Sequence, residues 1–236
     1  MKLNEEKVSY GIYSPGVLGI LIIGIIACLI LILVFNDVVV RNVLTVAVLS
    51  LAFIIGLIFY GSSTPLRVKR SELLVEFAKP KENSVMLDVG TGRGLVAITL
   101  AKAVKNCTVI GIDTWSPVAL SGLSGNTMEN AQRNAELENV AHKVKFQQAD
   151  ARKLPFEDNT FDLVTAHEVL DTLIVGRDEA LAEIYRVTKK GGKFVFSTAV
   201  SKFILVKKLS KLGFKRFEFM RLGLREGPTT FVLCRK

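Results

Sequence analysis

The sequence predicts an α/β domain in which a doubly wound, seven-stranded sheet ends in an antiparallel C-terminal hairpin. Three observations predict this fold and an apolar helical hairpin before it. Residues 17–35 and 43–60 are two uncharged apolar runs. Patterns typical of strands and of helices then alternate over residues 71–197. The last two strand-like segments, 214–221 and 230–235, have no helix between them and should pair antiparallel.

The first apolar run, residues 17–35, contains nineteen residues without charge or proline. A helix of this length spans roughly 28 Å, close to the ~30 Å hydrocarbon core of a bilayer. The second run, 43–60, follows a short loop and is also of spanning length. Residues 1–64 are therefore expected to form a transmembrane α-helical hairpin with membrane lipids as partners. A cleaved signal peptide is disfavoured by the second run, and a buried hairpin of a soluble protein is the remaining alternative.

Basic residues near the two runs predict the orientation. Arg67, Lys69 and Arg70 follow the second run, whereas the loop between the runs holds Arg41 alone. Positive side chains stay preferentially on the cytoplasmic side. The expectation is an integral membrane protein with the N-terminus and the large domain in the cytoplasm.

Charge is unevenly distributed along the chain. Residues 1–60 hold three basic and three acidic side chains, so the net charge of +9 lies on the remainder. Such an excess favours an anionic neighbour, either nucleic acid or lipid headgroups. The two histidines and three cysteines have no metal-ligand spacing, and no metal site is expected.

The large domain, residues 65–236, begins after the turn-like stretch 61–65. Strands that alternate with helices form a parallel sheet covered on both faces. Ser71 is expected to cap the first helix, and Gly191 and Gly192 to end the last. The expected strands are 84–89, 108–112, 143–148, 161–166 and 193–197, and the expected helices are 71–79, 95–105, 127–139 and 178–188.

A glycine-rich turn joins the first expected strand to the following helix. It reads Asp88-Val-Gly90-Thr-Gly92-Arg-Gly94. Glycines permit positive φ and close approach of a ligand to the backbone, and the helix N-terminus offers free N–H groups. A plain strand-to-helix connection is the alternative. The spacing also differs from the G-x-G-x-x-G of dinucleotide sites, because position 95 is Leu.

The pattern D-x-G-x-G-x-G resembles the first motif of class I S-adenosylmethionine (SAM)-dependent methyltransferases, which have a Rossmann-like fold. Further blocks resemble the ubiquinone/menaquinone-type branch, namely Leu154-Pro-Phe with Phe161-Asp-Leu-Val, and Tyr185-Arg-Val-Thr-Lys-Lys-Gly-Gly192. In the second block Lys190 replaces the usual proline. The resemblance covers about residues 71–236 and leaves the hairpin outside it.

The resemblance implies SAM as the cofactor and assigns residues to it. The turn would cradle the methionine part, Asp113 the ribose hydroxyls and Asp150 the adenine amino group. Each of these carboxylates alone could also be a solvated charge on a loop. Three carboxylates at the carboxyl ends of strands, however, lie where open α/β sheets bind ligands. No role is assigned to segment 115–126 beyond lining the cofactor edge. The implied cofactor residues are Asp88, Gly90, Thr91, Gly92, Gly94, Asp113, Thr114, Asp150, Ala151 and His167.

His167 is the candidate catalytic residue, because it follows the fourth strand, where the resemblance places the methyl acceptor. An imidazole titrates near neutral pH and suits a general base. The alternative is that His167 only packs against the cofactor, since many methyl transfers need alignment rather than a base.

The C-terminal stretch after residue 201 is basic and contains interleaved phenylalanines, including Phe203 and Phe219. Solvated charge with core aromatics, contact with anionic lipid, and nucleic-acid binding are the three interpretations. Nucleic acid is disfavoured, because no Asn/Asp-Pro-Pro-Tyr/Phe sequence follows the fourth strand.

The sequence thus predicts a membrane-anchored methyltransferase that acts on a small-molecule acceptor, such as a lipid, a quinone or another membrane-associated metabolite. The alternatives are a membrane-tethered SAM-binding sensor or scaffold without turnover, and a protein or RNA methyltransferase located at the membrane. The acceptor atom and the oligomeric state are left open.

Overall fold

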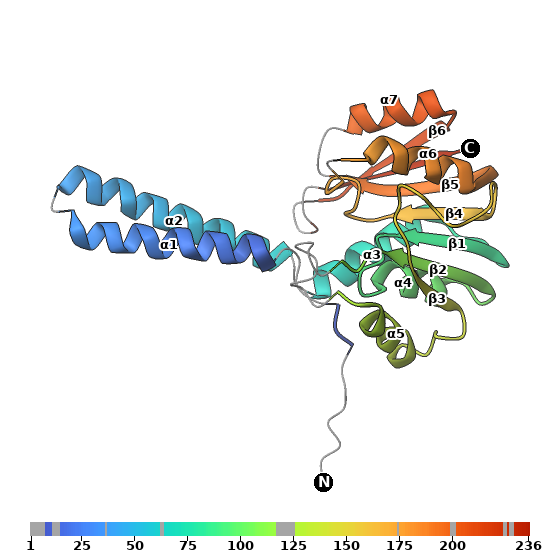
Figure 1. Ribbon diagram of the computed structural model, residues 1–236, viewed down its shortest axis with the longest axis horizontal. Coiled ribbons are helices and arrows are strands. Elements are labelled where there is room, and N and C mark those ends of the chain that lie inside the picture. The colour runs from blue at the N-terminus through green and yellow to red at the C-terminus, as the bar shows by residue number, and fades with distance from the viewer. Residues whose placement is uncertain are drawn as a thin grey trace, which may run out of the picture.

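The computed structural model describes residues 8–10, 15–35, 37–61, 64–116, 126–173, 175–198, 202–223, 226 and 229–236. Most of segment 115–126 therefore lies outside the described residues. Helices α1 (Pro15–Val34) and α2 (Val38–Gly61) pack side by side as a hairpin. The hairpin projects from an α/β domain that holds the remaining elements (Figure 1).

Helix α2 begins earlier than the expected residue 43. The Asp37 carboxylate accepts from the backbone N–H of Val40 at 2.9 Å, and the Asp37 carbonyl accepts from the N–H of Arg41 at 3.0 Å. These bonds satisfy N–H groups that a helix start leaves without partners. Arg41 therefore lies inside the first turns of α2, and its placement in a loop was wrong.

The surface of the hairpin is apolar. Among the described residues, one helical stretch is long and apolar enough to cross a membrane, the 19 residues Val38–Gly56, with a mean hydropathy of 2.4 and none of it buried. The apolar part described for α1, Gly19–Val34, is shorter. Among the described residues, α2 alone is long and apolar enough to cross a bilayer. The structure therefore does not establish the expected pair of membrane-spanning helices.

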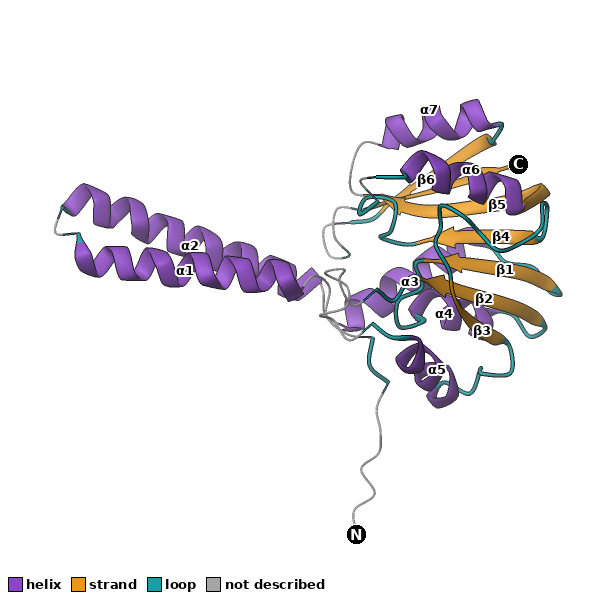
Figure 2. Cartoon of the chain, in the orientation of Figure 1, coloured by secondary structure: helices purple, strands orange, loops and turns teal. Residues whose placement is uncertain are grey.

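The α/β domain contains a mixed seven-stranded sheet in the order β3-β2-β1-β4-β5-β7-β6 (Figure 2). Strands β1 to β5 are parallel to their neighbours, whereas β7 runs antiparallel to both β5 and β6. This confirms the Rossmann-like arrangement with a C-terminal hairpin. The strands are β1 (Ser84–Val89), β2 (Cys107–Asp113), β3 (Val144–Gln148), β4 (Phe161–Ala166), β5 (Thr188–Thr198), β6 (Lys215–Arg221) and β7 (Thr230–Arg235).

Helices cover both faces of the sheet and enclose two apolar cores. Successive strand residues point to opposite faces, so Met86 packs in one core and Leu87 in the other. The first core lies under α3 (Thr64–Ala78), α4 (Leu95–Ala103) and α5 (Met128–Leu137). The second lies under α6 (Arg177–Val187) and α7 (Lys202–Leu212).

Two expected helix boundaries were wrong. Helix α3 starts at Thr64, and Ser71 lies within it, where its hydroxyl donates to the Val68 carbonyl at 2.8 Å instead of capping a terminus. Helix α6 ends at Val187, before Gly191 and Gly192, which belong to the start of β5. There the Gly191 N–H donates to the carbonyl of Lys236, so the glycines serve pairing with the C-terminus.

Helix α7 was not among the expected elements. Leu205 and Leu209, four residues apart, are buried on its inner side. The same spacing is visible in the sequence, but the two lysines between these leucines and the basic residues around them obscured it. Helix α7 makes the crossover from β5 to β6, so β7 can pair between them.

Candidate functional site

The candidate cofactor site lies at the carboxyl edge of the sheet, the edge at which β1, β2 and β4 end. Asp88 is the fifth residue of β1, Asp113 ends β2, and His167 directly follows β4. Because β1 pairs with both β2 and β4 in parallel, these three residues are brought to one edge. The fold thus assembles side chains that are up to 79 residues apart in sequence.

The glycine turn leads from β1 into α4 and has the backbone that only glycine adopts readily. Gly90, Gly92 and Gly94 have φ of 70°, 55° and 84°. A Cβ on Gly90 would come within 2.1 Å of a Val169 methyl group. The N–H groups of Gly90 and Thr91 both donate to the carbonyl of Ile112, so the turn is fixed against β2.

Asp88 is buried beneath the turn. Its Oδ1 accepts from the Thr165 hydroxyl at 2.7 Å. Within the described part of the chain, its Oδ2 and the hydroxyl of Thr91 are buried without a hydrogen-bond partner. Burial raises the pKa of Asp88 to about 6, although the nearby hydroxyls of Thr91 and Thr165 oppose the rise. Buried polar atoms without partners carry a free-energy cost that a polar ligand or a water can relieve.

Asp113 is held against the glycine turn. Its Oδ2 accepts from the N–H of Gly92 at 2.9 Å, and its Oδ1 accepts from the N–H of Trp115 at 3.1 Å. The indole N–H of Trp115 in turn donates to the Gly92 carbonyl at 2.9 Å. The neighbouring Thr114 carbonyl accepts from the Gln148 side chain at 2.8 Å. Asp113 is thus placed beside the turn, and its implied contact with the ribose hydroxyls stays a prediction.

Asp150 has a strong local partner. The Arg152 guanidinium donates to both carboxylate oxygens, with the shortest distance 2.6 Å. This hydrogen-bonded ion pair lowers the pKa of Asp150. Ala151 beside it is buried. The carboxylate is already engaged by Arg152, and its implied contact with an adenine amino group stays a prediction.

His167 lies in a buried, partly cationic environment. Its Nδ1 is buried and, among the described residues, has no hydrogen-bond partner, whereas its Nε2 lies 3.9 Å from a carboxylate oxygen of Glu168. Burial lowers the pKa of His167, with Arg67 and Arg70 acting in the same direction and Glu168 against it. Arg70 also forms an ion pair with Glu168 at 3.2 Å. The imidazole is therefore held neutral at neutral pH.

A network of hydrogen bonds that the sequence did not indicate ties the N-terminus to the glycine turn. The buried side chain of Asn134 donates to the carbonyls of Ser9 and Arg93, each at 3.0 Å, and accepts from the Ser9 N–H at 3.2 Å. The Arg93 guanidinium donates to the Ser9 hydroxyl at 2.9 Å. These residues are far apart in sequence, so no local pattern predicted the contacts among them. The burial of Asn134 became apparent only in the structure.

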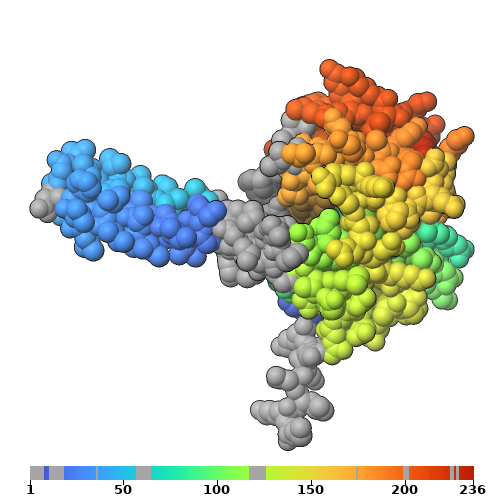
Figure 3. All heavy atoms as spheres, in the orientation of Figure 1, coloured from blue at the N-terminus to red at the C-terminus, as the bar shows by residue number. Residues whose placement is uncertain are grey.

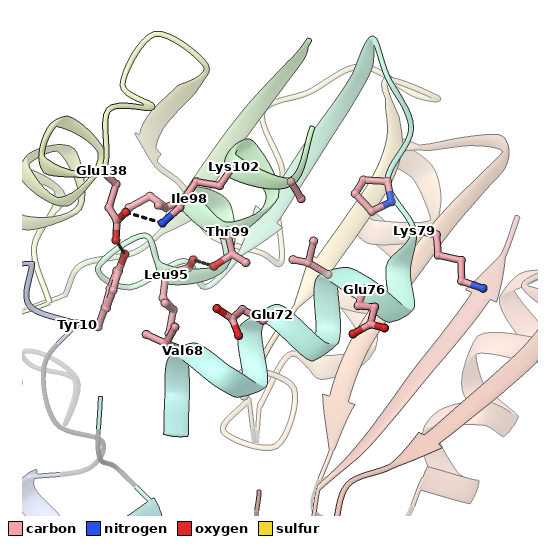
Figure 4. Close-up of a pocket in the computed structure, with 13 residues that line it drawn as sticks. Tyr10, Val68, Glu72, Glu76, Lys79, Leu95, Ile98, Thr99, Lys102 and Glu138 are labelled. Carbon is pink, nitrogen blue, oxygen red and sulfur yellow. Dashed lines mark hydrogen bonds and ion pairs between the residues drawn. The ribbon is translucent and has the colours of Figure 1, made fainter. Parts of the chain in front are cut away.

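A hollow of about 430 Å³ lies between α3 and α4, outside the candidate cofactor site. Its lining includes Val68, Glu72, Ile98 and Tyr10 (Figure 4). The Tyr10 hydroxyl donates to Glu138 at 3.3 Å at one end of it. None of the candidate cofactor residues lines this hollow, so its volume carries no argument about the cofactor.

The residues at the carboxyl edge fit SAM. The turn leaves a backbone cradle where a Cβ would clash, and the orphaned atoms of Asp88 and Thr91 lie buried beside it. A carboxylate suits both the amino group and the vicinal ribose hydroxyls of this ligand. The described residues contain no group of three His, Cys, Asp or Glu side chains that would hold a metal ion.

This fold and this edge resemble those of class I SAM-dependent methyltransferase domains. Residues 87–196 match the family model described as a methyltransferase domain. The matched stretch contains all of the candidate cofactor residues. This part of the chain is therefore similar to SAM-dependent methyltransferase domains, and the related proteins use S-adenosylmethionine as the cofactor.

Curated relatives agree with this assignment. The chain is 36% identical over 124 residues to the ubiquinone/menaquinone biosynthesis C-methyltransferase UbiE of Rickettsia felis, which covers 51% of this chain and 47% of that protein. It is 38% identical over 114 residues to a demethylmenaquinone methyltransferase of Lactiplantibacillus plantarum, over 48% of this chain and 44% of that protein. The chain thus spans about half the length of the curated relatives it matches.

Solved structures share the fold at low sequence identity. A SAM-dependent methyltransferase described as putative, from Methanococcus maripaludis, superposes with a TM-score of 0.58 at 19% identity, covering 73% of this chain and 85% of that one. The [4+2]-cyclase SpnF superposes with a TM-score of 0.56 at 21% identity, over 72% and 81% of the two chains. One fold therefore serves more than one chemistry, and the function depends on the residues of the site.

Proposed function

We propose that this protein is a membrane-anchored SAM-dependent methyltransferase whose acceptor is a small, membrane-associated molecule such as a lipid or a quinone. The observation that carries the catalytic part is the carboxyl edge, where the glycine turn meets Asp88 and Asp113. The quinone-type acceptors in the names of the curated relatives support an acceptor of this class.

The cofactor would lie with its amino-acid end at the glycine turn and its ribose at Asp113. Thr114, Asp150 and Ala151 would line the continuation of this edge toward the adenine ring. When bound, SAM supplies an electrophilic methyl group on a sulfonium sulfur. The chain's own contribution is to orient the cofactor and to align the acceptor with that methyl group.

His167 is the proposed general base. Its free Nδ1 is buried at the end of β4, and its lowered pKa keeps the lone pair available at neutral pH. Where the acceptor atom carries a proton, His167 Nδ1 takes it as the methyl group is transferred. An acceptor that carries no acidic proton would leave His167 a packing role.

The anchor rests on the exposed apolar surface of the hairpin. Side chains such as Ile23, Leu33, Val39 and Phe53 are mostly exposed on it. An exposed apolar surface of this extent is unfavourable in water and favourable in a bilayer. Both helices would span, and Arg67, Lys69 and Arg70 would keep the N-terminus and the catalytic domain on the cytoplasmic side.

Two measurements test the function. Calorimetry of the full chain in lipid nanodiscs should show binding of SAM and of S-adenosylhomocysteine, and Asp113→Ala should weaken it strongly. Incubation with methyl-tritiated SAM and a membrane lipid extract should then give labelled product in the organic phase. Cofactor binding without any labelled product would favour a sensor or scaffold, and label confined to the aqueous phase would favour a protein or RNA acceptor.

A further inference from the structure

Four large apolar side chains are exposed on the catalytic domain itself. Among the described residues from 64 onward, Val175, Phe203, Ile204 and Phe219 are exposed by 76%, 74%, 55% and 48%. Single exposed apolar residues are ordinary on a protein surface, but a group of them marks a contact site.

Three of the four residues, Phe203, Ile204 and Phe219, lie together at one corner of the domain. The Lys202 ammonium lies 5.6 Å from the ring centre of Phe203 and 5.1 Å from that of Phe219. These two contacts place the first turn of α7 next to β6. Ile204 follows Phe203 in that turn. Val175 lies two residues before the start of α6, which packs beside α7. We call Phe203, Ile204 and Phe219 the α7 corner.

Exposed basic side chains lie on the same helix and strand as the α7 corner. Lys207 and Lys211 are exposed on α7, and Arg221 is exposed at the end of β6. The acidic groups nearby are partly engaged, because Asp178 pairs with Lys208 and Glu218 with Arg235 at 3.7 Å. The rim of the apolar cluster therefore carries an excess of positive charge that complements an anionic surface.

The α7 corner lies on the side of the domain from which the hairpin projects. Helices that cross over between parallel strands begin at the carboxyl edge, so the first turns of α6 and α7 share the edge of the glycine turn. Figure 1 shows this edge directed toward the hairpin, and Figure 3 shows α7 at the margin of the same side. A bilayer around the hairpin would thus face the α7 corner.

We propose that the α7 corner rests on the bilayer and inserts Phe203 and Ile204 among anionic headgroups. This rests on the proposed membrane anchoring of the hairpin. Interfacial helices bury their apolar side chains roughly 5–10 Å into the headgroup region, with lysines at the rim. The contact fixes the tilt of the domain, so the carboxyl edge faces the membrane and an acceptor reaches it without crossing water.

The composition of the α7 corner favours lipid over a protein partner. Protein interfaces are depleted in lysine, whereas Lys202, Lys207 and Lys211 all lie on α7. Lysine is by contrast the usual neighbour of apolar side chains on helices that lie in the membrane interface.

The test places a tryptophan at the corner of the full-length chain. Trp115→Phe removes the single native tryptophan, and Phe203→Trp then reports from the corner. The matched control is Lys81→Trp in the same background, because Lys81 is exposed at the opposite edge, just before β1. Both variants are reconstituted into phosphatidylcholine vesicles with or without phosphatidylglycerol, and with brominated phosphatidylcholine as the quencher.

Flotation with the vesicles tests the anchor, and quenching tests the corner. The expected result is that both variants float, that emission from position 203 falls by roughly half with brominated lipid, and that emission from position 81 is unchanged. The quenching should weaken without phosphatidylglycerol and in Lys202→Glu/Lys207→Glu, while flotation persists. Failure to float would overturn the anchor and, with it, the docking that depends on it.

Two results would overturn the docking alone. The first is a floating protein in which position 203 is quenched no more than position 81. The second is a blue shift at position 203 that grows with protein concentration and ignores brominated lipid, because this would assign the corner to a protein contact.

Discussion

The indole N–H of Trp115 donates a hydrogen bond of 2.9 Å to the backbone carbonyl of Gly92, in the middle of the glycine turn. Asp113 completes the arrangement, because its carboxylate accepts from the backbone N–H of both residues. Trp115 also has a positive φ of 42°, a backbone conformation that residues other than glycine rarely adopt. The indole thus lies directly against the backbone that is proposed to cradle the methionine part of the cofactor.

Trp115 should therefore report cofactor binding by its own fluorescence. It is the single tryptophan of the chain, and a ligand at Gly92 must change the surroundings of the indole. Titration of the full chain with S-adenosylhomocysteine is expected to give a saturable change in tryptophan emission. Trp115→Phe provides the control and should give no signal. Emission that stays constant while calorimetry detects binding would place the ligand away from Trp115.

Asp113 should be required for cofactor affinity. Removing its carboxylate deletes the acceptor proposed for the ribose hydroxyls and leaves the Gly92 N–H without its partner. Asp113→Ala is expected to weaken SAM binding by about 100-fold or more, since charge-assisted hydrogen bonds contribute about 1.5–3 kcal/mol each. Asp113→Asn, which keeps one acceptor oxygen, should lose less. Calorimetry measures both, and an unchanged affinity in Asp113→Ala would contradict the assignment.

Asp88 should make the stability of the apo protein depend on pH. Its folded-state pKa is raised to about 6 by burial, so the folded state holds the proton between about pH 4 and 6 while the unfolded state releases it. Stability therefore falls as pH rises through this window, by about 3 kcal/mol in total. Asp88→Asn should lack this slope in chemical denaturation measured from pH 4 to 7.

Thr165→Val tests the cause of that pH dependence. The Thr165 hydroxyl donates to Asp88 and opposes the raised pKa, so its loss should move the end of the slope to higher pH. A slope that persists in Asp88→Asn would assign it to another group.

His167 should determine the acid limb of the rate profile for an acceptor that carries a proton. Its pKa is lowered by burial, so the base form persists below its ordinary value and the rate should decline only at a pH below about 6.5. His167→Ala is expected to lower kcat by about 100-fold and to remove this limb, with cofactor affinity retained. His142→Ala, at an exposed histidine, is the matched control. An intact acid limb in His167→Ala would show that His167 is not the general base and only packs at the site.

Asn134 should link the N-terminal segment to cofactor binding. It is buried and makes three hydrogen bonds to Ser9 and Arg93, and Arg93 belongs to the glycine turn. Asn134→Ala is expected to destabilise the domain by about 1–3 kcal/mol, because partners are left without bonds. It should also weaken SAM binding. Gln132→Ala, an exposed amide on the same helix, should change neither quantity, and equal effects of the two variants would exclude the proposed link.

The arrangement of the strands was largely predictable from the sequence. Strands β1 and β4 are mostly apolar and almost entirely buried, and burial on both faces leaves such segments few alternatives. Helix α7 was missed although Leu205 and Leu209 have helical spacing. Its basic and aromatic residues face outward, and no local rule separates an exposed helix face from a solvated tail.

The sequence by itself determined the glycine turn and the order of the acidic residues, because a turn needs particular residue types at fixed local spacing. It also determined the apolar runs of the hairpin, which depend on composition and length alone. The tertiary structure decided which groups those residues meet. Asp113 bonds to Gly92, Asp150 is engaged by Arg152, and Asn134 joins Ser9 to the turn. Such contacts depend on strand order and helix placement, which the summed packing of the whole domain determines rather than any local stretch of sequence.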